Sequence, residues 1–146
     1  MGVSSAPQYT NLSDLCNDVQ KIVDSYRKEV LGGIEAGADE CAKVFIDEVK
    51  KVSPYDADNT KTPHYKDSWK IKPMRRAKYV RYVGNTKRVK GKDKSGKATL
   101  IPLINILEFS TDAHKHQPHV GTAVNNSKGQ IISIITSKIQ KGGTNA

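Results

Sequence analysis

The sequence predicts an α+β fold in which a long N-terminal amphipathic helix and a C-terminal helix pack on a small antiparallel β-sheet. Three patterns support this prediction. Apolar residues recur at helical spacing in residues 12–52, alternate with polar residues in 65–83, and return to helical spacing in 118–139. The patterns follow one another without an internal repeat, so we expect one domain over residues 1–146.

Length and composition limit the class of protein. A chain of 146 residues with 36% hydrophobic and 27% charged residues has enough apolar material for one core. We expect flexible ends at residues 1–10 and 140–146. No run reaches the roughly 18 to 20 apolar residues of a membrane-spanning helix, and residues 1–10 lack the apolar segment of a signal peptide. The sequence therefore predicts a protein made and used in a cytoplasm-like compartment, or in an assembly built there.

The first helix is predicted from an apolar repeat that runs from Leu12 to Val52. The repeat fits one long helix or two consecutive helices. Each glycine inside a helix costs about 1 kcal/mol relative to alanine. We therefore expect a kink or a short break near Gly32 and Gly33.

The ends of this helix are predicted from capping chemistry. Thr10 or Asn11 can accept a hydrogen bond from the first turn, and Pro54 disfavours helical geometry at Ser53. Residues 53–64 contain two prolines and several Asp, Asn and Thr residues, which predicts a loop.

Two antiparallel strands with basic outer faces are predicted at Tyr65 to Lys72 and at Tyr79 to Val83. Residues 85–97 contain six lysines and arginines and almost no apolar side chains, so they form a mobile basic loop or a long hairpin tip. Such a segment can become ordered on contact with a partner.

Residues 100–109 are the most apolar stretch and predict a strand followed by a short helix that Pro102 opens. Leu103, Ile104 and Leu107 would face the core of the domain. Pro118 marks the start of the last helix, which residues 125–129 can interrupt.

The two cysteines, Cys16 and Cys41, stand 25 positions apart without a CxxC motif, which excludes a disulfide scaffold or a structural zinc site. We expect both thiols to pack as small apolar groups in the helix face.

Charge is distributed unevenly along the chain, whose net charge is +9. Residues 1–59 carry a net charge of −5, residues 60–97 carry +12, and residues 98–146 carry +2. The basic middle segment therefore predicts attraction to a polyanion or to the acidic face of another copy of the protein.

Candidate chemical sites are weak. His114, His116 and His119 form an HxHxxH cluster whose spacing fits no established metal site, so we expect a polar loop and no metal or cofactor. Four acidic residues can be considered as sources of a catalytic general acid and general base. Neither a nucleophile nor a phosphate-binding loop accompanies them, so we expect no enzyme activity. These acids are Asp56, Asp58, Glu108 and Asp112.

Nucleic-acid binding stays open as an alternative, through residues 66–97. Trp69, Tyr79 and Tyr82 lie among basic residues and can add base stacking to phosphate contacts. Strands would, however, separate core-facing aromatic rings from solvent-facing lysines.

Four motifs, taken in order, resemble a known family. The chain resembles the small head-tail connector or tail-completion (minor tail) proteins of long-tailed bacteriophages, whose pattern runs approximately (A/S)PVDTG.L..S(W/I), (V/Y)EFGT and QPF..PA before a final helix. The matching segments are Val52-Ser53-Pro54-Tyr55-Asp56, Tyr65-Lys66-Asp67-Ser68-Trp69, Leu107-Glu108-Phe109-Ser110-Thr111, and Gln117-Pro118-His119-Val120 with Ala123. The chain departs from the pattern at Ala57-Asp58, which replace Thr-Gly and are followed by an insertion that reaches His64, at Ser110 in place of glycine, and at His119 in place of an aromatic residue.

The resemblance implies a structural virion protein of the neck or upper tail, assembled in the bacterial cytoplasm as a homo-oligomeric ring without an active site. In this interpretation Pro54 stops the helix, Asp56 bonds amides in the turn, Trp69 anchors the strand and Phe109 adds a second core anchor. The full set of structural motif residues is Ser53, Pro54, Asp56, Trp69, Glu108, Phe109, Thr111, Pro118 and Ala123.

The charge asymmetry predicts how such subunits meet. An acidic helix on one copy and a basic strand and loop on the next would be complementary around a ring. The basic loop can instead dock on a neighbouring connector, tail-terminator or tail-tube protein, and genome DNA is a secondary partner. The predicted assembly interface comprises Arg75, Arg76, Arg81, Lys87, Arg88, Lys90 and Lys92.

Overall fold

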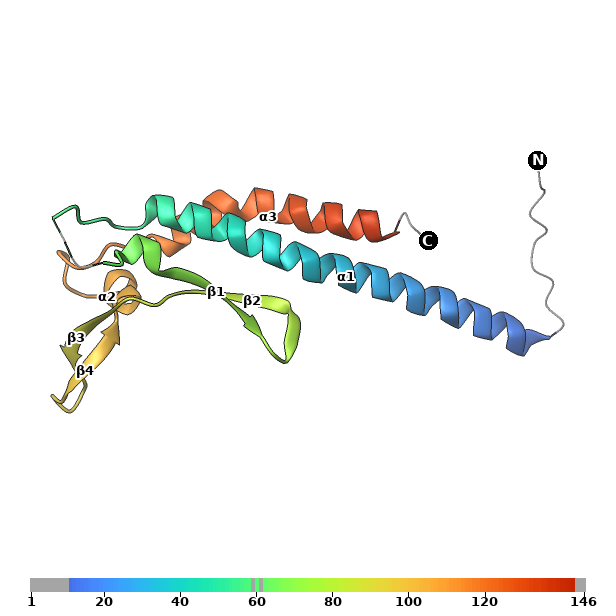
Figure 1. Cartoon of the computed structure of the whole chain (residues 1–146), viewed down its shortest axis with the longest axis horizontal. Helices are drawn as coiled ribbons and strands as arrows, with labels where there is room; N and C mark the ends of the chain where they lie inside the picture. Colours follow the sequence, from blue (N-terminus) through green and yellow to red (C-terminus); the bar gives the residue numbers. More distant parts are fainter. Residues whose placement is uncertain (1–10, 59, 61, 144–146) are drawn as a thin grey trace.

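A computed structural model describes residues 11–58, 60 and 62–143 of the chain (Figure 1). The elements are α1 (Leu12–Val52), the 3-10 helix η1 (Tyr65–Ser68), β1 (Trp69–Met74), β2 (Ala77–Asn85), β3 (Arg88–Lys92), β4 (Ala98–Pro102), α2 (Leu103–Phe109) and α3 (Val120–Gly143). α3 lies antiparallel to the C-terminal part of α1, and the β1–β2 hairpin packs on another side of α1 (Figure 1). This arrangement confirms the predicted α+β fold class.

α1 is one uninterrupted helix of 41 residues, so the break predicted near Gly32 and Gly33 is wrong. The reason is the close approach of α3. A Cβ atom on Gly33 would lie 2.7 Å from the backbone oxygen of Lys138, whereas one on Gly32 would meet nothing within 4 Å. Because Gly33 has no side chain, α3 can pack directly against the backbone of α1 at this position. This packing offsets the cost of glycine to helix stability.

Both ends of α1 follow the predicted capping chemistry. The Asn11 side chain accepts a hydrogen bond from the Asp14 amide at 2.9 Å, whereas Thr10, the other candidate, lies outside the described residues. Ser53 has extended backbone angles at the C-terminal end, directly before Pro54. The following segment is a loop, in which the Asp56 carboxylate accepts a hydrogen bond from the Asp58 amide at 3.1 Å. This contact confirms the role predicted for Asp56.

α3 continues from Val120 to Gly143, so the predicted interruption at 125–129 is wrong. Of the flexible tail predicted at 140–146, residues 140–143 are helical, and residues 144–146, like the flexible end predicted at 1–10, lie outside the described residues. The polar segment at 125–129 stays helical because one of its residues faces the interior. The fully buried Ser127 donates its hydroxyl proton to the Ala123 backbone oxygen at 2.8 Å. Within the described part of the chain, no helix combines the length and the apolar content needed to cross a membrane.

The strands form two separate two-stranded antiparallel sheets in place of the single predicted sheet. β2 and β3 follow each other closely in the chain, but β2 pairs with β1 and β3 pairs with β4. The Thr86 amide bonds the Ser68 backbone oxygen beside β1, and the Leu103 amide bonds the Lys87 backbone oxygen beside β4, both at 2.9 Å. One extended stretch of chain therefore pairs first with β1 and then with β4.

The first predicted strand begins four residues too early, because residues 65–68 form the 3-10 helix η1. The His64 backbone oxygen accepts from the Asp67 amide at 3.1 Å and from the Ser68 hydroxyl at 2.8 Å. These local bonds replace the ladder bonds that a strand would make.

Residues 85–97 were predicted as a mobile basic loop or a long hairpin tip, but Arg88–Lys92 form strand β3, which pairs with β4, and only residues 93–97 form the turn of this hairpin. Asp93 closes its turn by accepting hydrogen bonds from the amides of Ser95 and Lys97, each at 2.9 Å. Gly96 supplies the one positive φ angle among the described residues, +82°. The turn residues thus match the backbone geometry that the hairpin requires.

The core lies where the C-terminal end of α1 meets η1, β1 and the start of α3. Its buried residues are Val49, Tyr65, Trp69 and Ala123. β4 leads directly into α2 as predicted, and Leu103, Ile104 and Leu107 pack against this core.

Candidate functional site

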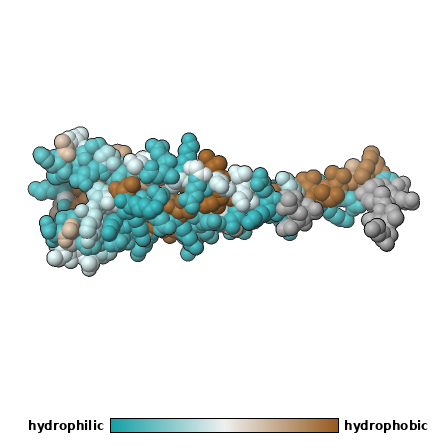
Figure 2. Space-filling model, turned by 90° about the horizontal axis from the view of Figure 1, so that it is seen from above, coloured by the Kyte–Doolittle hydropathy of each residue, from teal (hydrophilic) through white to brown (hydrophobic). Residues whose placement is uncertain are grey.

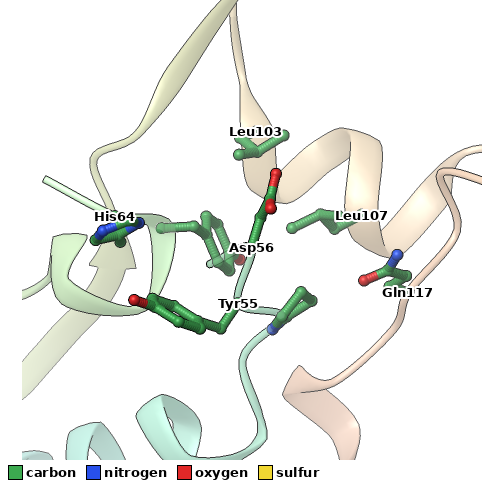
Figure 3. A pocket seen from close by; sticks show the side chains of 8 residues that line it. Tyr55, Asp56, His64, Leu103, Leu107 and Gln117 are labelled. Carbon is green, nitrogen blue, oxygen red and sulfur yellow. The ribbon is translucent and has the colours of Figure 1, made fainter. Parts of the chain in front are cut away.

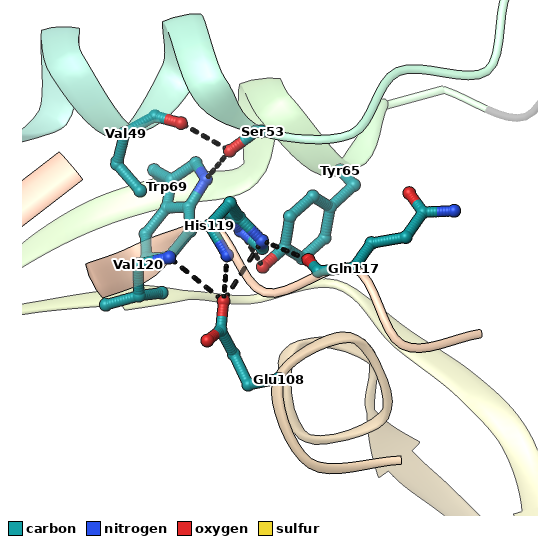
Figure 4. A network of polar contacts seen from close by, with 8 residues as sticks. All are labelled: Val49, Ser53, Tyr65, Trp69, Glu108, Gln117, His119 and Val120. Atoms are coloured by element: carbon teal, nitrogen blue, oxygen red, sulfur yellow. Dashed lines mark hydrogen bonds and ion pairs between the residues drawn. The ribbon is translucent and has the colours of Figure 1, made fainter. Parts of the chain in front are cut away.

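The motif segments meet at the C-terminal end of α1 (Figure 4). Ser53 donates its hydroxyl proton to the Val49 backbone oxygen at 2.5 Å and accepts a hydrogen bond from the Trp69 indole nitrogen at 3.0 Å. Trp69 is buried in the core. The predicted role of Trp69, anchoring the strand against the helix, is confirmed, and Ser53 fixes the orientation of its ring.

Glu108 joins α2 to the beginning of α3. Its Oε1 accepts hydrogen bonds from the backbone amides of His119 at 2.8 Å and Val120 at 3.0 Å (Figure 4). The first amides of a helix lack partners within the helix and carry partial positive charge. A carboxylate from another helix therefore caps α3, which gives Glu108 a structural role.

His119 connects this carboxylate to the buried hydroxyl of Tyr65. Its Nδ1 lies 2.9 Å from the Gln117 backbone oxygen and 3.0 Å from Glu108 Oε1, and both of these atoms are acceptors. Nδ1 consequently carries the proton, and in the neutral ring Nε2 accepts from the Tyr65 hydroxyl at 3.0 Å. The His119 ring also packs edge-on against Tyr65 and Trp69. His119 thus contributes both aromatic ring contacts and hydrogen bonds to this cluster.

The order hydroxyl, imidazole and carboxylate resembles a nucleophile with its base, but the environment favours a structural role. Only 7% of Tyr65 and 4% of His119 is exposed. Burial, together with the negative charge of Glu108, raises the pKa of the Tyr65 hydroxyl well above its usual range, so the hydroxyl keeps its proton. The three side chains satisfy one another's hydrogen bonds and hold η1, α2 and α3 together.

Phe109 does not anchor the core, because 79% of it is exposed. α2 turns Leu103, Ile104 and Leu107 inward, and a residue two positions after Leu107 points to a different face of the helix. Thr111 and Pro118 are also exposed, and Pro118 lies two residues before α3 begins. Ala123, by contrast, is fully buried in the core.

A pocket of about 470 Å³ opens beside the motif cluster (Figure 3). Pro54 and Asp56 line it from the loop after α1, and Leu103, Leu107 and Gln117 line it from α2 and the loop that follows. At its edge the Tyr55 ring lies 4.9 Å from the His64 ring, and the Lys66 ammonium lies 4.1 Å from the Tyr55 ring centroid. Apolar and polar side chains therefore both line the pocket.

The predicted cations form an exposed row on the β3–β4 hairpin. Arg88, Lys90 and Lys92 alternate along one face of β3, and Lys90 lies opposite the exposed Leu100. This face is thus both basic and partly apolar.

Other predicted cations are spread elsewhere, and some already have partners. Arg75 and Arg76 are exposed in the turn between β1 and β2. Lys87 donates to the Pro63 backbone oxygen at 2.7 Å. Only 10% of the Arg81 side chain is exposed, because its guanidinium bonds Asp39 of α1, and this bond lowers the pKa of that carboxyl. Part of the predicted attraction between the acidic helix and the basic strand therefore acts within one chain.

An exposed apolar stripe on α1 is the feature that sequence reasoning missed. The face predicted to lie in the core is uncovered in the N-terminal part of the helix, where 75% of Leu12 and 66% of Ile22 is exposed (Figure 2). Cys16 is exposed there as well, contrary to prediction, whereas Cys41 is buried. This exposure could have been predicted from the lengths of the two helices. At about 1.5 Å per residue, the 24 residues of α3 are too short to cover the 41 residues of α1.

The candidate metal-binding histidines do not come together. Of the candidate acids, Asp56 bonds the Asp58 amide in the loop after α1, and Glu108 caps α3. His114 and His116 are exposed in the loop before α3, whereas His119 is buried in the motif cluster. Across the described residues, no three His, Cys, Asp or Glu side chains are placed to hold a metal ion.

The chain was also compared with known proteins. No family model, no curated protein and no solved structure gives a significant match.

Proposed function

We propose that this chain is a structural protein of a long-tailed bacteriophage virion, a ring subunit that completes the tail or joins it to the head through protein contacts. The observation that carries the proposal is the motif cluster. Segments that were selected by their resemblance to connector proteins meet there: Ser53 bonds Trp69, Glu108 bonds the His119 amide, and the His119 ring bonds Tyr65, which lies 54 positions away in the chain.

The surfaces left open support a role in assembly. The row of Arg88, Lys90 and Lys92 lies on a hairpin that extends from the rest of the domain (Figure 1), and the exposed stripe lies on the protruding part of α1. Exposed apolar faces of this kind mark protein interaction sites. A subunit with binding surfaces at both ends can contact different neighbours.

The proposal is tested by locating the protein in the virion. Gold-labelled antibody against this chain should mark purified particles of the encoding phage at the junction of head and tail. Label that is absent from purified virions would contradict the proposal.

The hairpin row is tested by complementation. Lys90→Glu should leave unattached tails in the lysate, whereas Lys128→Glu, the same change at an exposed position of α3, should support joining. Both variants should fold, since neither side chain is buried. Equal joining by the two variants would exclude Lys90 from the contact.

Nucleic-acid binding is the second candidate, and one observation favours it. Tyr82 is exposed on the outer face of the β1–β2 hairpin, directly opposite Lys72 in the register. An aromatic ring beside a cation suits base stacking with phosphate contact. In this case the protein should bind unrelated DNA at low salt, with affinity falling steeply as salt rises.

A further inference from the structure

Six apolar residues form a continuous face on the protruding part of α1. We name this face the tip stripe; its members are Leu12, Leu15, Val19, Ile22, Val23 and Tyr26. At about 1.5 Å per residue, the tip stripe is roughly 21 Å long. Along the helix it runs on towards Gly33 and Gly37, where α3 covers α1. The tip stripe is thus an extension of the α1–α3 interface for which the chain supplies no partner among its described residues.

A second apolar surface lies in the middle of α1. We name it the mid-helix groove; it has a volume of about 430 Å³. Its lining is mostly apolar and includes Phe45 of α1, Tyr79 and Val83 of β2, and Ile131 and Ile135 of α3, together with the guanidinium-bearing Arg81. Tyr79 is exposed at its edge. Apolar side chains from a partner can therefore enter between β2 and α3.

We propose that the tip stripe of one copy of this chain docks in the mid-helix groove of a second copy. A chain cannot fill its own groove, because Ile22 and Phe45 lie on the same uninterrupted helix at a fixed separation. Two different surfaces that bind each other between copies make a head-to-tail interface, which closes into a ring or continues as a filament. This inference rests on the proposed ring and names the residues that would join its subunits.

Charge supports a second copy as the occupant. Residues 12–26 contain three aspartates and one lysine. Lys43 of α1 is exposed next to the lining residue Ala42, and its charge acts on Asp39, which bonds the lining residue Arg81. Of the acidic residues nearby, Asp39 is paired with Arg81 and Glu40 with Lys138, whereas Glu35 is exposed and its charge also acts on Arg81. The acidic tip of one copy can therefore approach Lys43 of the next copy.

Cross-linking tests this contact directly. The chain would carry Tyr79→Cys at the groove edge and Cys41→Ala in its lining, with the native Cys16 exposed beside the tip stripe. A short bismaleimide should then give a ladder of covalent dimers, trimers and larger species, because each copy offers two different reactive positions. Adding Cys16→Ser should abolish the ladder.

Two results would overturn the proposal. Dimers that persist without Tyr79→Cys would show that Cys16 meets Cys16, which is a tip-to-tip contact. A chain that stays uncross-linked and monomeric up to its solubility limit would show that the tip stripe does not bind a second copy.

A matched pair of variants tests the energetic role of the tip stripe. Full burial of one isoleucine corresponds to roughly 10- to 150-fold in affinity, so Ile22→Asp should raise the half-assembly concentration by at least that factor. Asn17→Asp adds the same charge on another face of the helix and should change the half-assembly concentration little. Both variants should keep the far-UV circular dichroism of the wild type, because both positions are exposed and far from the core. Equal assembly of the two variants would contradict the proposal.

The outcomes separate this inference from the proposed function. Gold label at the neck without a cross-linked ladder would keep the virion role and reject this docking. A ladder from a protein that is absent from virions would keep the docking and reject the role.

Discussion

Adjacent glycines in α1 should respond in opposite directions to the same substitution. Alanine is favoured over glycine in a helix by about 1 kcal/mol, so Gly32→Ala should stabilise the fold by up to that amount. At Gly33 the new Cβ would lie 2.7 Å from the Lys138 backbone oxygen, and α3 would have to move. Overpacking of this kind typically costs about 1 to 3 kcal/mol. Gly33→Ala should therefore be less stable than Gly32→Ala by roughly 1 to 3 kcal/mol.

Urea unfolding followed by circular dichroism measures this difference, provided that the slope with denaturant is the same for both variants. The two substitutions are chemically identical and adjacent, so effects on the unfolded chain nearly cancel. Equal stabilisation by both variants would refute the close packing of α3 on α1 at this point.

Three further predictions concern the motif cluster and the charged hairpin. Glu108→Ala removes the acceptor for the amides of His119 and Val120 and should lower the unfolding free energy by about 2 to 4 kcal/mol. Asp18→Ala, which loses only an exposed ion pair with Lys21, should cost less than about 1 kcal/mol, and similar losses for the two variants would exclude capping of α3 by Glu108. The pKa of Tyr65 is higher in the folded than in the unfolded protein, so the fold is stabilised at neutral pH by the protonated hydroxyl and loses this contribution as pH rises above about 10. Tyr65→Phe should therefore flatten the fall of the unfolding free energy with pH above about 10. An unchanged slope of that free energy against pH would contradict the burial of the hydroxyl. Replacing Arg88, Lys90 and Lys92 with glutamate should block the joining of heads to tails in a complementation assay. It should leave the midpoint of thermal unfolding within a few degrees of wild type, because these side chains are exposed. A large fall in this midpoint would instead mean that the row supports the fold.

Local chemistry predicted the ends and types of most elements. Asn11 and Ser53 were identifiable from capping and from Pro54, and the step from β4 to α2 followed from Pro102. Each of these signals acts within a few residues of chain, so no knowledge of distant contacts is needed.

The misassigned features depend on distant partners. Continuity through Gly33 depends on the close approach of Lys138, and exposure of the tip stripe depends on where α3 ends. Phe109 was misplaced because its orientation follows from the face that α2 turns to the core. Apolar periodicity identifies a helix face, but it does not say what covers that face.

The sequence identified several residues of the candidate site, but it did not predict which of them contact one another. The motif resemblance selected Ser53, Trp69 and Glu108, yet nothing local indicated that Glu108 would cap a helix that begins 12 residues later. The partner of His119 was equally hidden, since Tyr65 lies 54 positions away. Spatial convergence of this kind emerges only from the fold.

The most direct test of the proposed function is electron microscopy of lysates from the encoding phage without this gene. If the chain completes the tail or joins it to the head, DNA-filled heads should accumulate beside unattached tails, and the wild-type gene supplied in trans should restore joined particles. Joined particles that lack DNA or fail to eject it would contradict a connector role and favour a protein that handles the genome.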